Sequence, residues 1–229
     1  KFGKIKGKNL QHAYKTFNHH EYRKFIKNVD DKIYHALFNT LYYTGLRKSE
    51  ILALKISDLN DNIFDSYLNI NKTITRNLYN GKHLILTPKT KKSMRKVYID
   101  IFLFIELKQL ITYYSKKYKG FNINFYLFGG IKPISSTSLD RYKNYYCDKA
   151  NVKRITIHEF RHTHATMLNK MNIRTKLIQE RLGHSDISTT MNIYIHENDE
   201  ENKVNSENNS ENETTNNSIA YDCRIGKYL

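Results

Sequence analysis

The stretch HEFRHTHATML, which runs from His158 to Leu168, holds side chains that could do two kinds of chemistry. On a helix, His158 and His162 lie four residues apart on one face, where they could bind zinc with Glu159 as the general base. His158 and Arg161, three residues apart, would also share a face, and an arginine there is suited to bind a phosphate. The rest of the sequence must show whether this stretch is a zinc site or a phosphate-binding site.

A metal-free enzyme that cuts a phosphodiester needs a nucleophile, cations for the two non-bridging oxygens, and an acid for the departing oxygen. Arg47 follows a glycine near the start of a predicted helix, where its guanidinium could bind a phosphate. Glu50 would share its helical face and could orient a neighbouring group. Lys89 lies between two predicted strands, where a hairpin tip could carry it into a cleft, although lysines at such tips are also ordinary contacts to a phosphate backbone.

The stretch ERLGHSDISTTMNIYIH supplies two further candidates. His184 follows a glycine at a predicted helix end, and Tyr194 comes ten residues later. The chain has 18 tyrosines, so Tyr194 does not stand out by itself, and a single tyrosine on a helix usually packs in a core or an interface. These residues gain significance only from their order along the chain.

That order resembles the catalytic domain of the tyrosine recombinases, and of phage and conjugative-transposon integrases in particular. The matching motifs are TGLRKSE, the TPKTKKSMRKV hairpin, HEFRHTHATML and LGHSDISTTMNIY, and with their connections they cover residues 19–196. The resemblance implies a site-specific DNA recombinase that cuts and rejoins strands through a 3′-phosphotyrosine intermediate, integrating or excising a mobile element.

The resemblance also implies a role for each candidate. Tyr194 matches the nucleophile that attacks the scissile phosphate. Arg47 and Arg161 match the pair that binds the non-bridging oxygens. His184 matches the residue that hydrogen-bonds the phosphate, and Glu50 matches an acidic residue that supports the catalytic groups.

Proton transfer is assigned in the same way. Lys89 matches the hairpin lysine that protonates the leaving 5′-oxygen, with Lys91 and Lys92 in the same turn as alternatives. His158 matches the residue that assists proton transfer at the nucleophile. Because the phosphotyrosine keeps the bond energy, the resemblance implies neither a metal nor ATP. It implies double-stranded DNA with att or terminal-repeat sites as the partner, and a homotetramer on DNA in the full-length protein.

The charge of the chain favours a polyanionic partner. There are 38 Lys and Arg against 22 Asp and Glu, a net charge of +16. The stretch 197–218 holds seven acids and one base, so 37 bases face 15 acids elsewhere, a net +22. No run of about 18 apolar residues and no signal peptide is visible, and Cys147 and Cys223 lie far apart, so we expect an intracellular protein. The resemblance to integrases implies a cytoplasmic, nucleoid-associated location.

The elements expected to position these residues are mostly helical. Apolar residues recur at helical spacing, and the sequence predicts helices near 19–29, 31–44, 100–118, 136–149, 158–170, 174–182 and 187–195. Another helical run, RKSEILALK, begins at or just after Leu46. Between about 66 and 99 the residues are β-branched and aromatic, with a turn signal at 80–81. We therefore predict an α+β fold, mostly helical with one small antiparallel β-sheet.

Three domains are expected along the chain. Residues 1–18 are interpreted as a basic linker from a missing N-terminal DNA-binding domain, and 19–196 as the catalytic domain. Residues 197–229 form an acidic, Asn-rich tail that we predict to be disordered, because its composition offers too little apolar surface to bury.

Three alternatives stay open at this stage. A zinc metalloprotease would use the HExxH letters with Glu180 as a third ligand, but short motifs of this kind arise by chance, and Arg161 would place a cation beside the metal. A DNA-binding relative without catalysis would keep the scaffold alone. A type IB topoisomerase would share related chemistry, although LGHSDISTTMNIY looks more like integrases.

Overall fold

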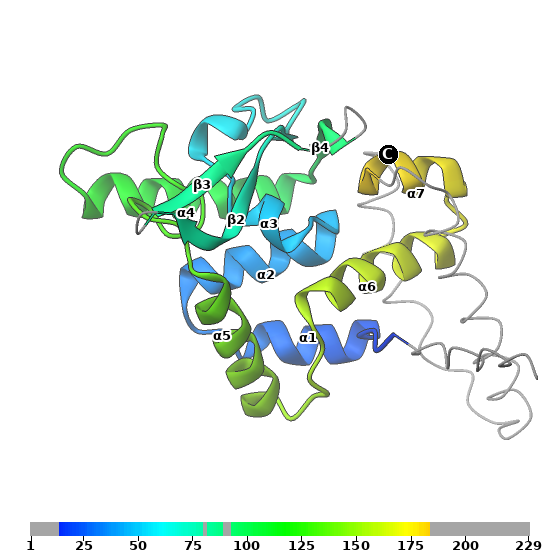
Figure 1. Cartoon of the computed structure of the whole chain (residues 1–229). Helices are drawn as coiled ribbons and strands as arrows, with labels where there is room; N and C mark the ends of the chain where they lie inside the picture. The colour runs from blue at the N-terminus through cyan, green and yellow to red at the C-terminus, as the bar shows by residue number, and fades with distance from the viewer. Residues whose placement is uncertain (1–13, 80–81, 89–92, 184–229) are drawn as a thin grey trace, which may run out of the picture.

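The computed structural model describes residues 14–79, 82–88 and 93–183, and within these ranges it is mostly helical with small antiparallel sheets (Figure 1). In chain order the elements are α1 (His19–Lys27), α2 (Lys32–Thr44), α3 (Lys48–Ile51), the 3-10 helix η1 (Ile56–Asp58), β1 (Tyr67–Ile70), β2 (Thr73–Tyr79), β3 (Lys82–Leu86), β4 (Arg95–Tyr98), α4 (Ile101–Lys117), α5 (Ser136–Lys149), α6 (Ile157–Lys170) and α7 (Thr175–Leu182). The predicted α+β class is confirmed. No helix in the described ranges is long and apolar enough to cross a membrane.

Helix α2 lies at the centre and packs against α1, α4 and α6 (Figure 1). Its Phe38 ring is 5.0 Å from the ring of Phe25 on α1 and 5.9 Å from that of Phe160 on α6, measured between centroids. All three rings are fully buried, and aromatic groups of this size contribute strongly to a core. Because Phe160 directly precedes Arg161, this packing fixes the part of α6 that carries the candidate site.

The start of α6 is set by a capping box. The Thr156 side chain accepts a hydrogen bond from the Glu159 backbone N–H, and the Glu159 carboxylate accepts one from the Thr156 N–H. The helices predicted between 19 and 182 are confirmed, with ends that differ by a few residues at most, apart from the one starting at Leu46. The helix predicted at 187–195 lies outside the described residues.

The helix predicted to start at Leu46 is much shorter than its sequence pattern suggests. It comprises only Lys48–Ile51, after which the chain passes through a turn at 52–53 and a bridge at Lys55 into the 3-10 helix η1. The Leu54 carbonyl accepts a hydrogen bond of 2.8 Å from the Leu127 N–H, and the Ile56 N–H donates to Phe125 at 2.9 Å. This pairing with a distant segment ends the helix, because the same backbone groups are then no longer available to it.

The single predicted sheet is in fact two separate antiparallel pairs, β1 with β4 and β2 with β3. Strand β1 places Leu68 and Ile70 on one buried face, opposite Val97 of β4. That shared apolar face explains why β1 pairs with the distant β4 and not with β2. The predicted turn at 80–81 lies outside the described residues.

Candidate functional site

Glu50 is a buried carboxylate at the centre of a group of arginines. It is 1% exposed, and its Oε1 accepts from Arg47 Nη1 at 2.8 Å and from Arg95 Nη1 at 3.0 Å. Its Oε2 accepts from the Arg47 backbone N–H at 2.9 Å and from Arg95 Nη2 at 3.0 Å. Burial alone would raise the pKa of Glu50, but the hydrogen bonds and charge of Arg95 and the charge of Arg47 outweigh it and lower that pKa. Glu50 is therefore ionised at neutral pH and fixes both arginines.

Arg47 lies at the start of α3, where Gly45 ends the preceding helix. Gly45 has φ of 62°, a left-handed conformation that ends α2 and turns the chain toward α3. The Arg47 side chain is 33% exposed, which leaves it accessible from solvent. Its Nη2 donates to the Gly183 carbonyl at 2.8 Å, so its guanidinium is held by α3 on one side and by the end of α7 on the other.

Arg161, on the second turn of α6, is almost completely buried. Its side chain donates from Nη1 to the Gly45 carbonyl at 2.9 Å and from Nη2 to the Leu182 carbonyl at 2.7 Å. Burial and then the positive charge of Arg47 lower the pKa of Arg161, although an arginine keeps its proton in proteins. The lowered pKa reflects the energetic cost of holding this charge next to a second one. A bound anion would reduce that cost.

The C-terminal end of α7 is where these arginines meet. Three successive carbonyls each accept a hydrogen bond from a different guanidinium, and such carbonyls form the negative end of the helix dipole. The pairs are Arg181 with Arg95 Nε at 2.6 Å, Leu182 with Arg161 Nη2 at 2.7 Å, and Gly183 with Arg47 Nη2 at 2.8 Å. The residue immediately before His184 is thus bonded to Arg47.

Sequence reasoning missed a second buried arginine, Arg181. It is 9% exposed, its Nη2 donates to the Tyr43 and Tyr98 carbonyls, each at 3.0 Å, and its Nε donates to His164 Nε2 at 3.2 Å. A signal did exist, because Arg181 falls three residues after the buried Ile178, on the apolar face of α7.

His164 and Arg95 were also missed. His164 is fully buried, and its Nδ1 lies 2.9 Å from the Tyr42 carbonyl. Because Nε2 accepts from Arg181, Nδ1 carries the proton and donates to that carbonyl. Burial and then the charge of Arg181 lower the pKa of His164, which keeps it neutral. Arg95 was hidden among neighbouring basic residues of the hairpin.

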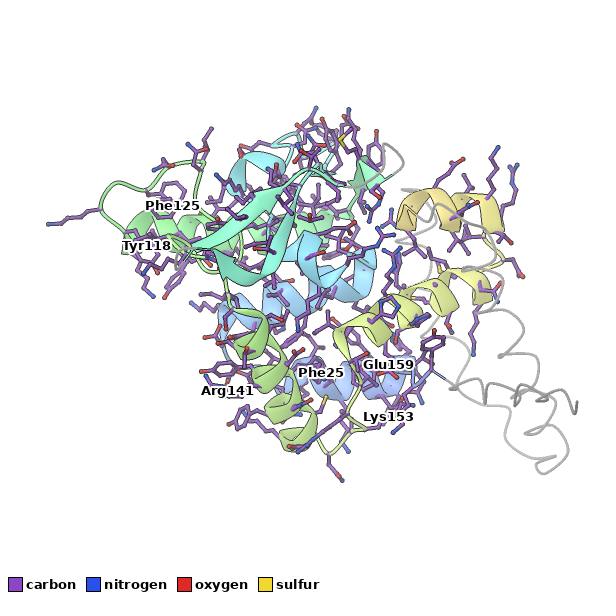
Figure 2. The ribbon with its side chains drawn as sticks, viewed as in Figure 1. Phe25, Tyr118, Phe125, Arg141, Lys153 and Glu159 are labelled. Atoms are coloured by element: carbon purple, nitrogen blue, oxygen red, sulfur yellow. The ribbon has the colours of Figure 1, made fainter. Side chains whose placement is uncertain are left out.

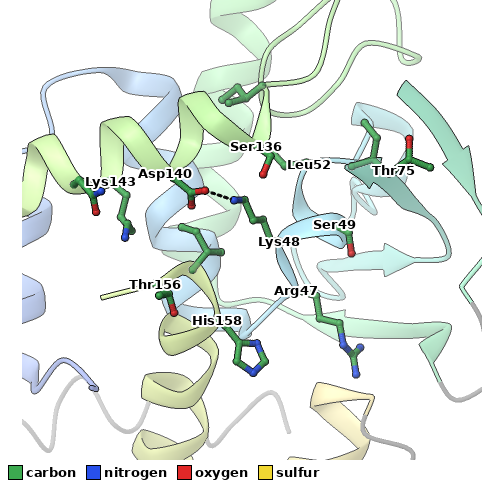
Figure 3. Close-up of a pocket in the computed structure, with 14 residues that line it drawn as sticks. Arg47, Lys48, Ser49, Leu52, Thr75, Ser136, Asp140, Lys143, Thr156 and His158 are labelled. Atoms are coloured by element: carbon green, nitrogen blue, oxygen red, sulfur yellow. Dashed lines mark hydrogen bonds and ion pairs between the residues drawn. The ribbon is translucent and has the colours of Figure 1, made fainter. Parts of the chain in front are cut away.

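His158 lies in the first turn of α6 and lines the same cavity as Arg47 (Figure 3). Its side chain is exposed, and partial burial in the cavity, followed by the charges of Arg161 and Arg47, lowers its pKa. At neutral pH the imidazole is neutral and can accept a proton.

The cavity has a volume of about 560 Å³, and polar and charged residues line it together with the apolar Leu52, Ile74, Ile134 and Ile157. Helix α5 contributes Ser136, Asp140 and Lys143, and Asp140 forms an ion pair with Lys48 of α3 (Figure 3). Burial lowers the pKa of Lys143, whose Nζ donates to the Ile155 carbonyl. Arg47, Lys48 and Lys143 give this cavity a positive charge that suits it to an anionic ligand.

Four of the predicted site residues are thus brought together: Arg47, Glu50 and Arg161 through shared hydrogen bonds, and His158 across the cavity. The other three, Lys89, His184 and Tyr194, lie outside the described residues, as do the alternative lysines at 91 and 92.

The zinc interpretation of HEFRH is not supported. Both carboxylate oxygens of Glu159 accept backbone N–H groups, Oε2 from Thr156 and Oε1 from Lys15, and Glu180 is exposed to solvent. Within the described ranges, no three His, Cys, Asp or Glu side chains are placed to hold a metal ion.

Comparison with known proteins identifies the family. The profile of the phage integrase family matches residues 15–201. The ICEBs1 integrase of Bacillus subtilis (strain 168) is 29% identical over 191 residues, which cover 77% of this chain and 49% of that protein. The integrase of Staphylococcus phage L54a is 32% identical over 161 residues, 67% of this chain and 45% of that protein. The chain thus spans about half the length of these relatives.

Solved structures show the same fold. The Tn1549 transposon integrase in complex with transposon right end DNA superposes with a TM-score of 0.66 at 23% identity, covering 79% of this chain and 61% of that one. The XerH site-specific recombinase bound to its difH substrate superposes with a TM-score of 0.59 at 23% identity, covering 82% and 52%. With its family profile, its relatives and its fold in agreement, the chain belongs to the phage integrase family, the tyrosine recombinases.

Proposed function

We propose that this protein cuts and rejoins DNA strands as a site-specific recombinase that integrates or excises a mobile element. The observation that carries the proposal is the cluster in which one buried carboxylate, Glu50, orients Arg47 and Arg95, with Arg161 beside them and His158 across the same cavity. Arg47, Arg95 and Arg161 together carry more positive charge than the single carboxylate of Glu50 can balance. A phosphate diester placed against Arg47 and His158 would supply the missing negative charge.

In the proposed reaction, the Tyr194 oxygen attacks the scissile phosphorus, and the bond from phosphorus to the 5′-oxygen breaks. The 3′-phosphate is then linked to the tyrosine, and the departing 5′-oxygen takes a proton from Lys89, or from Lys91 or Lys92. His158 accepts the tyrosine proton, in keeping with its lowered pKa. A 5′-hydroxyl from another strand reverses these steps and rejoins the DNA.

Arg47 and Arg161 are proposed to bind the two non-bridging oxygens, and His184 to hydrogen-bond the same phosphate. Preorganised cations of this kind stabilise the charge that develops in the transition state without a metal ion. The hydrogen bond between Arg47 and Gly183 supports the role proposed for His184, because Gly183 precedes it in the chain.

The partner is proposed to be double-stranded DNA carrying att or terminal-repeat sites, bound by a homotetramer of the full-length protein. Support comes from the net positive charge of the chain and from related recombinases that were solved with DNA. We place this activity at the bacterial nucleoid.

The test uses nicked duplexes in which cleavage releases a short fragment, so that religation is blocked and covalent protein–DNA adducts accumulate. A pool with randomised arms serves as the probe, and adducts are isolated under denaturing conditions and sequenced. We expect the wild-type chain to form adducts in the presence of EDTA. We expect Tyr194→Phe to form none while it binds the same duplexes equally well.

The outcomes separate the candidate functions. Binding without any wild-type adduct would identify a DNA-binding relative without catalysis and overturn the proposed reaction. Adducts that persist in Tyr194→Phe would place the nucleophile elsewhere. Activity that disappears in EDTA and returns with zinc would favour metal-dependent chemistry.

A further inference from the structure

The chain that leads into α1, residues 14–18 and here called the lead-in segment, lies along α6. The Lys15 backbone N–H donates to Glu159 Oε1 at 3.0 Å, and the Phe17 N–H donates to Thr163 Oγ1 at 3.1 Å. The Phe17 ring also packs edge-on against Phe160, with centroids 5.6 Å apart. Figure 2 shows Glu159 on the side of α6 that faces the start of α1. The residues of HEFRHT that the proposed reaction does not use therefore hold this segment.

His162 is an unusual member of this contact. It is 6% exposed, and within the described structure neither of its ring nitrogens has a hydrogen-bond partner. Burial, followed by the neighbouring His158 and Arg161, lowers the pKa of His162 to about 4, so the ring is neutral. Buried polar groups normally find partners, and one without them needs an explanation.

Contacts with two neighbouring rings explain why His162 is buried. The His162 ring is stacked on Tyr14, with centroids 3.7 Å apart and planes 20° from parallel. The His158 ring also contacts the His162 ring, nearly at right angles (86°), with centroids 4.7 Å apart. Tyr14, His162 and His158 thus form a continuous row of three rings that ends at the cavity.

Within the described ranges, the imidazole of His158 has no hydrogen-bond partner to restrain it. Its side chain is exposed, and as a residue of the first helical turn it can exchange between rotamers unless a neighbour restricts it. The edge contact with His162 supplies such a restraint, and Tyr14 holds His162 from the other side.

We infer that Tyr14 and His162 are positioning residues that hold the imidazole of His158 in the cavity, so that the docked lead-in segment is part of the functional site. This inference rests on the proposed function for its role in catalysis. Its geometric content, that Tyr14 restrains His158 through His162, stands apart from any reaction. Small errors in the position of a proton acceptor lower the rate by large factors, about a hundredfold for 1 Å.

The experiment compares variants that remove a ring with variants that keep one. Tyr14→Ala and His162→Ala remove a ring, whereas Tyr14→Phe and His162→Phe keep it. Lys15→Ala is the matched control, because Lys15 contacts Glu159 through its backbone. For each folded protein, single-turnover adduct formation is measured at saturating concentration of the nicked duplex that the wild type cleaves best, and affinity is measured separately.

We expect both alanine variants to form adducts at least about tenfold more slowly, with affinity within about twofold of the wild type. The two phenylalanine variants and Lys15→Ala should keep the wild-type rate. Alanine variants that fold and react as fast as the wild type would overturn the inference. A His162→Phe variant as slow as His162→Ala would show that the imidazole nitrogens act directly.

A second readout needs no DNA and no activity. The ring protons of His158 are followed by NMR as a function of pH in the wild type and in Tyr14→Ala, with the exposed His20 as internal control. We expect the His158 chemical shifts and titration to change in Tyr14→Ala while the His20 chemical shifts at each pH match those of the wild type. Unchanged His158 signals would overturn the inference, even if the wild type forms no adduct and the proposed function fails.

Discussion

Glu50→Gln should strongly lower the free energy of unfolding, although glutamine has nearly the same size and shape as glutamate. The carboxylate is 1% exposed, and the Arg95 side chain that it binds through two hydrogen bonds is 7% exposed. Glutamine keeps the size of the side chain but removes the charge, and it directs an amide N–H₂ group at a guanidinium that also donates. Removing one partner of a buried ion pair costs about 3–5 kcal/mol, because the other charge stays buried without compensation.

The matched control is Asp61→Asn, which makes the same chemical change at the surface. Asp61 is 70% exposed and pairs with Lys108, which is 40% exposed. Pairs of this kind contribute about 0–1 kcal/mol, so the control should unfold close to the wild type. The chain has no tryptophan, and far-UV circular dichroism in urea is therefore the appropriate assay.

The pH dependence provides an internal check. The folded pKa of Glu50 is lowered, so its ionisation stabilises the fold above the unfolded pKa, and this contribution is lost as the pH falls through the folded value. The difference between wild type and Glu50→Gln should therefore be full at pH 7 and shrink in acid. A Glu50→Gln protein within about 1 kcal/mol of wild type at pH 7 would refute the view that this carboxylate holds the arginine cluster together.

Three further predictions concern backbone, titration and salt. Gly45→Ala should lower the free energy of unfolding in urea by about 2–4 kcal/mol, because φ is 62° and a Cβ would lie 2.7 Å from side-chain atoms of His164 and Leu182. The control Gly120→Ala, with positive φ and no atom within 4 Å of the Cβ, should lower it by only about 1 kcal/mol. Equal losses in the two variants would contradict the packing argument. His162→Phe should lose less stability in acid than the wild type. The His162 pKa is about 4 in the folded state against 6.5 when unfolded, which lowers the wild-type free energy of unfolding by about 2 kcal/mol between pH 7 and pH 5. Identical pH profiles of unfolding for wild type and His162→Phe would show that His162 is not buried as a neutral ring. DNA affinity should fall with a slope of about −4 or steeper in a plot of log K against log salt, as for four or five neutralised phosphates, and a flat response would mean that the basic surface does not contact the backbone.

The helices could be predicted where local signals agree. Apolar spacing is a local feature, and it placed α6 within one residue of its observed start, where the Thr156 capping box begins the helix. Helix α3 was predicted too long because its end depends on Leu54 pairing with Leu127, more than seventy residues away. A local pattern carries no information about such a partner. The antiparallel strands were predicted, but their division into two separate pairs was not, because β1 pairs with the distant β4.

Candidate site residues could be predicted only where they belong to a sequence motif. Arg47, Glu50 and Arg161 were proposed because they follow a known order of motifs. The structure brings the three together, and their roles stay predictions. Arg181 and His164 were missed because an arginine or histidine in a helical stretch is usually exposed. Only the folded chain shows that the two lie side by side and that Arg181 reaches carbonyls of α2 and β4.

The most direct test of the proposed reaction is to locate the covalent link. The adduct from the nicked duplex is digested with protease and nuclease, and mass spectrometry identifies the residue that carries the 3′-nucleotide. We predict a single modified residue, Tyr194, with a yield unaffected by EDTA. A nucleotide on any other side chain, or an adduct that forms only with added metal, would contradict the proposed reaction.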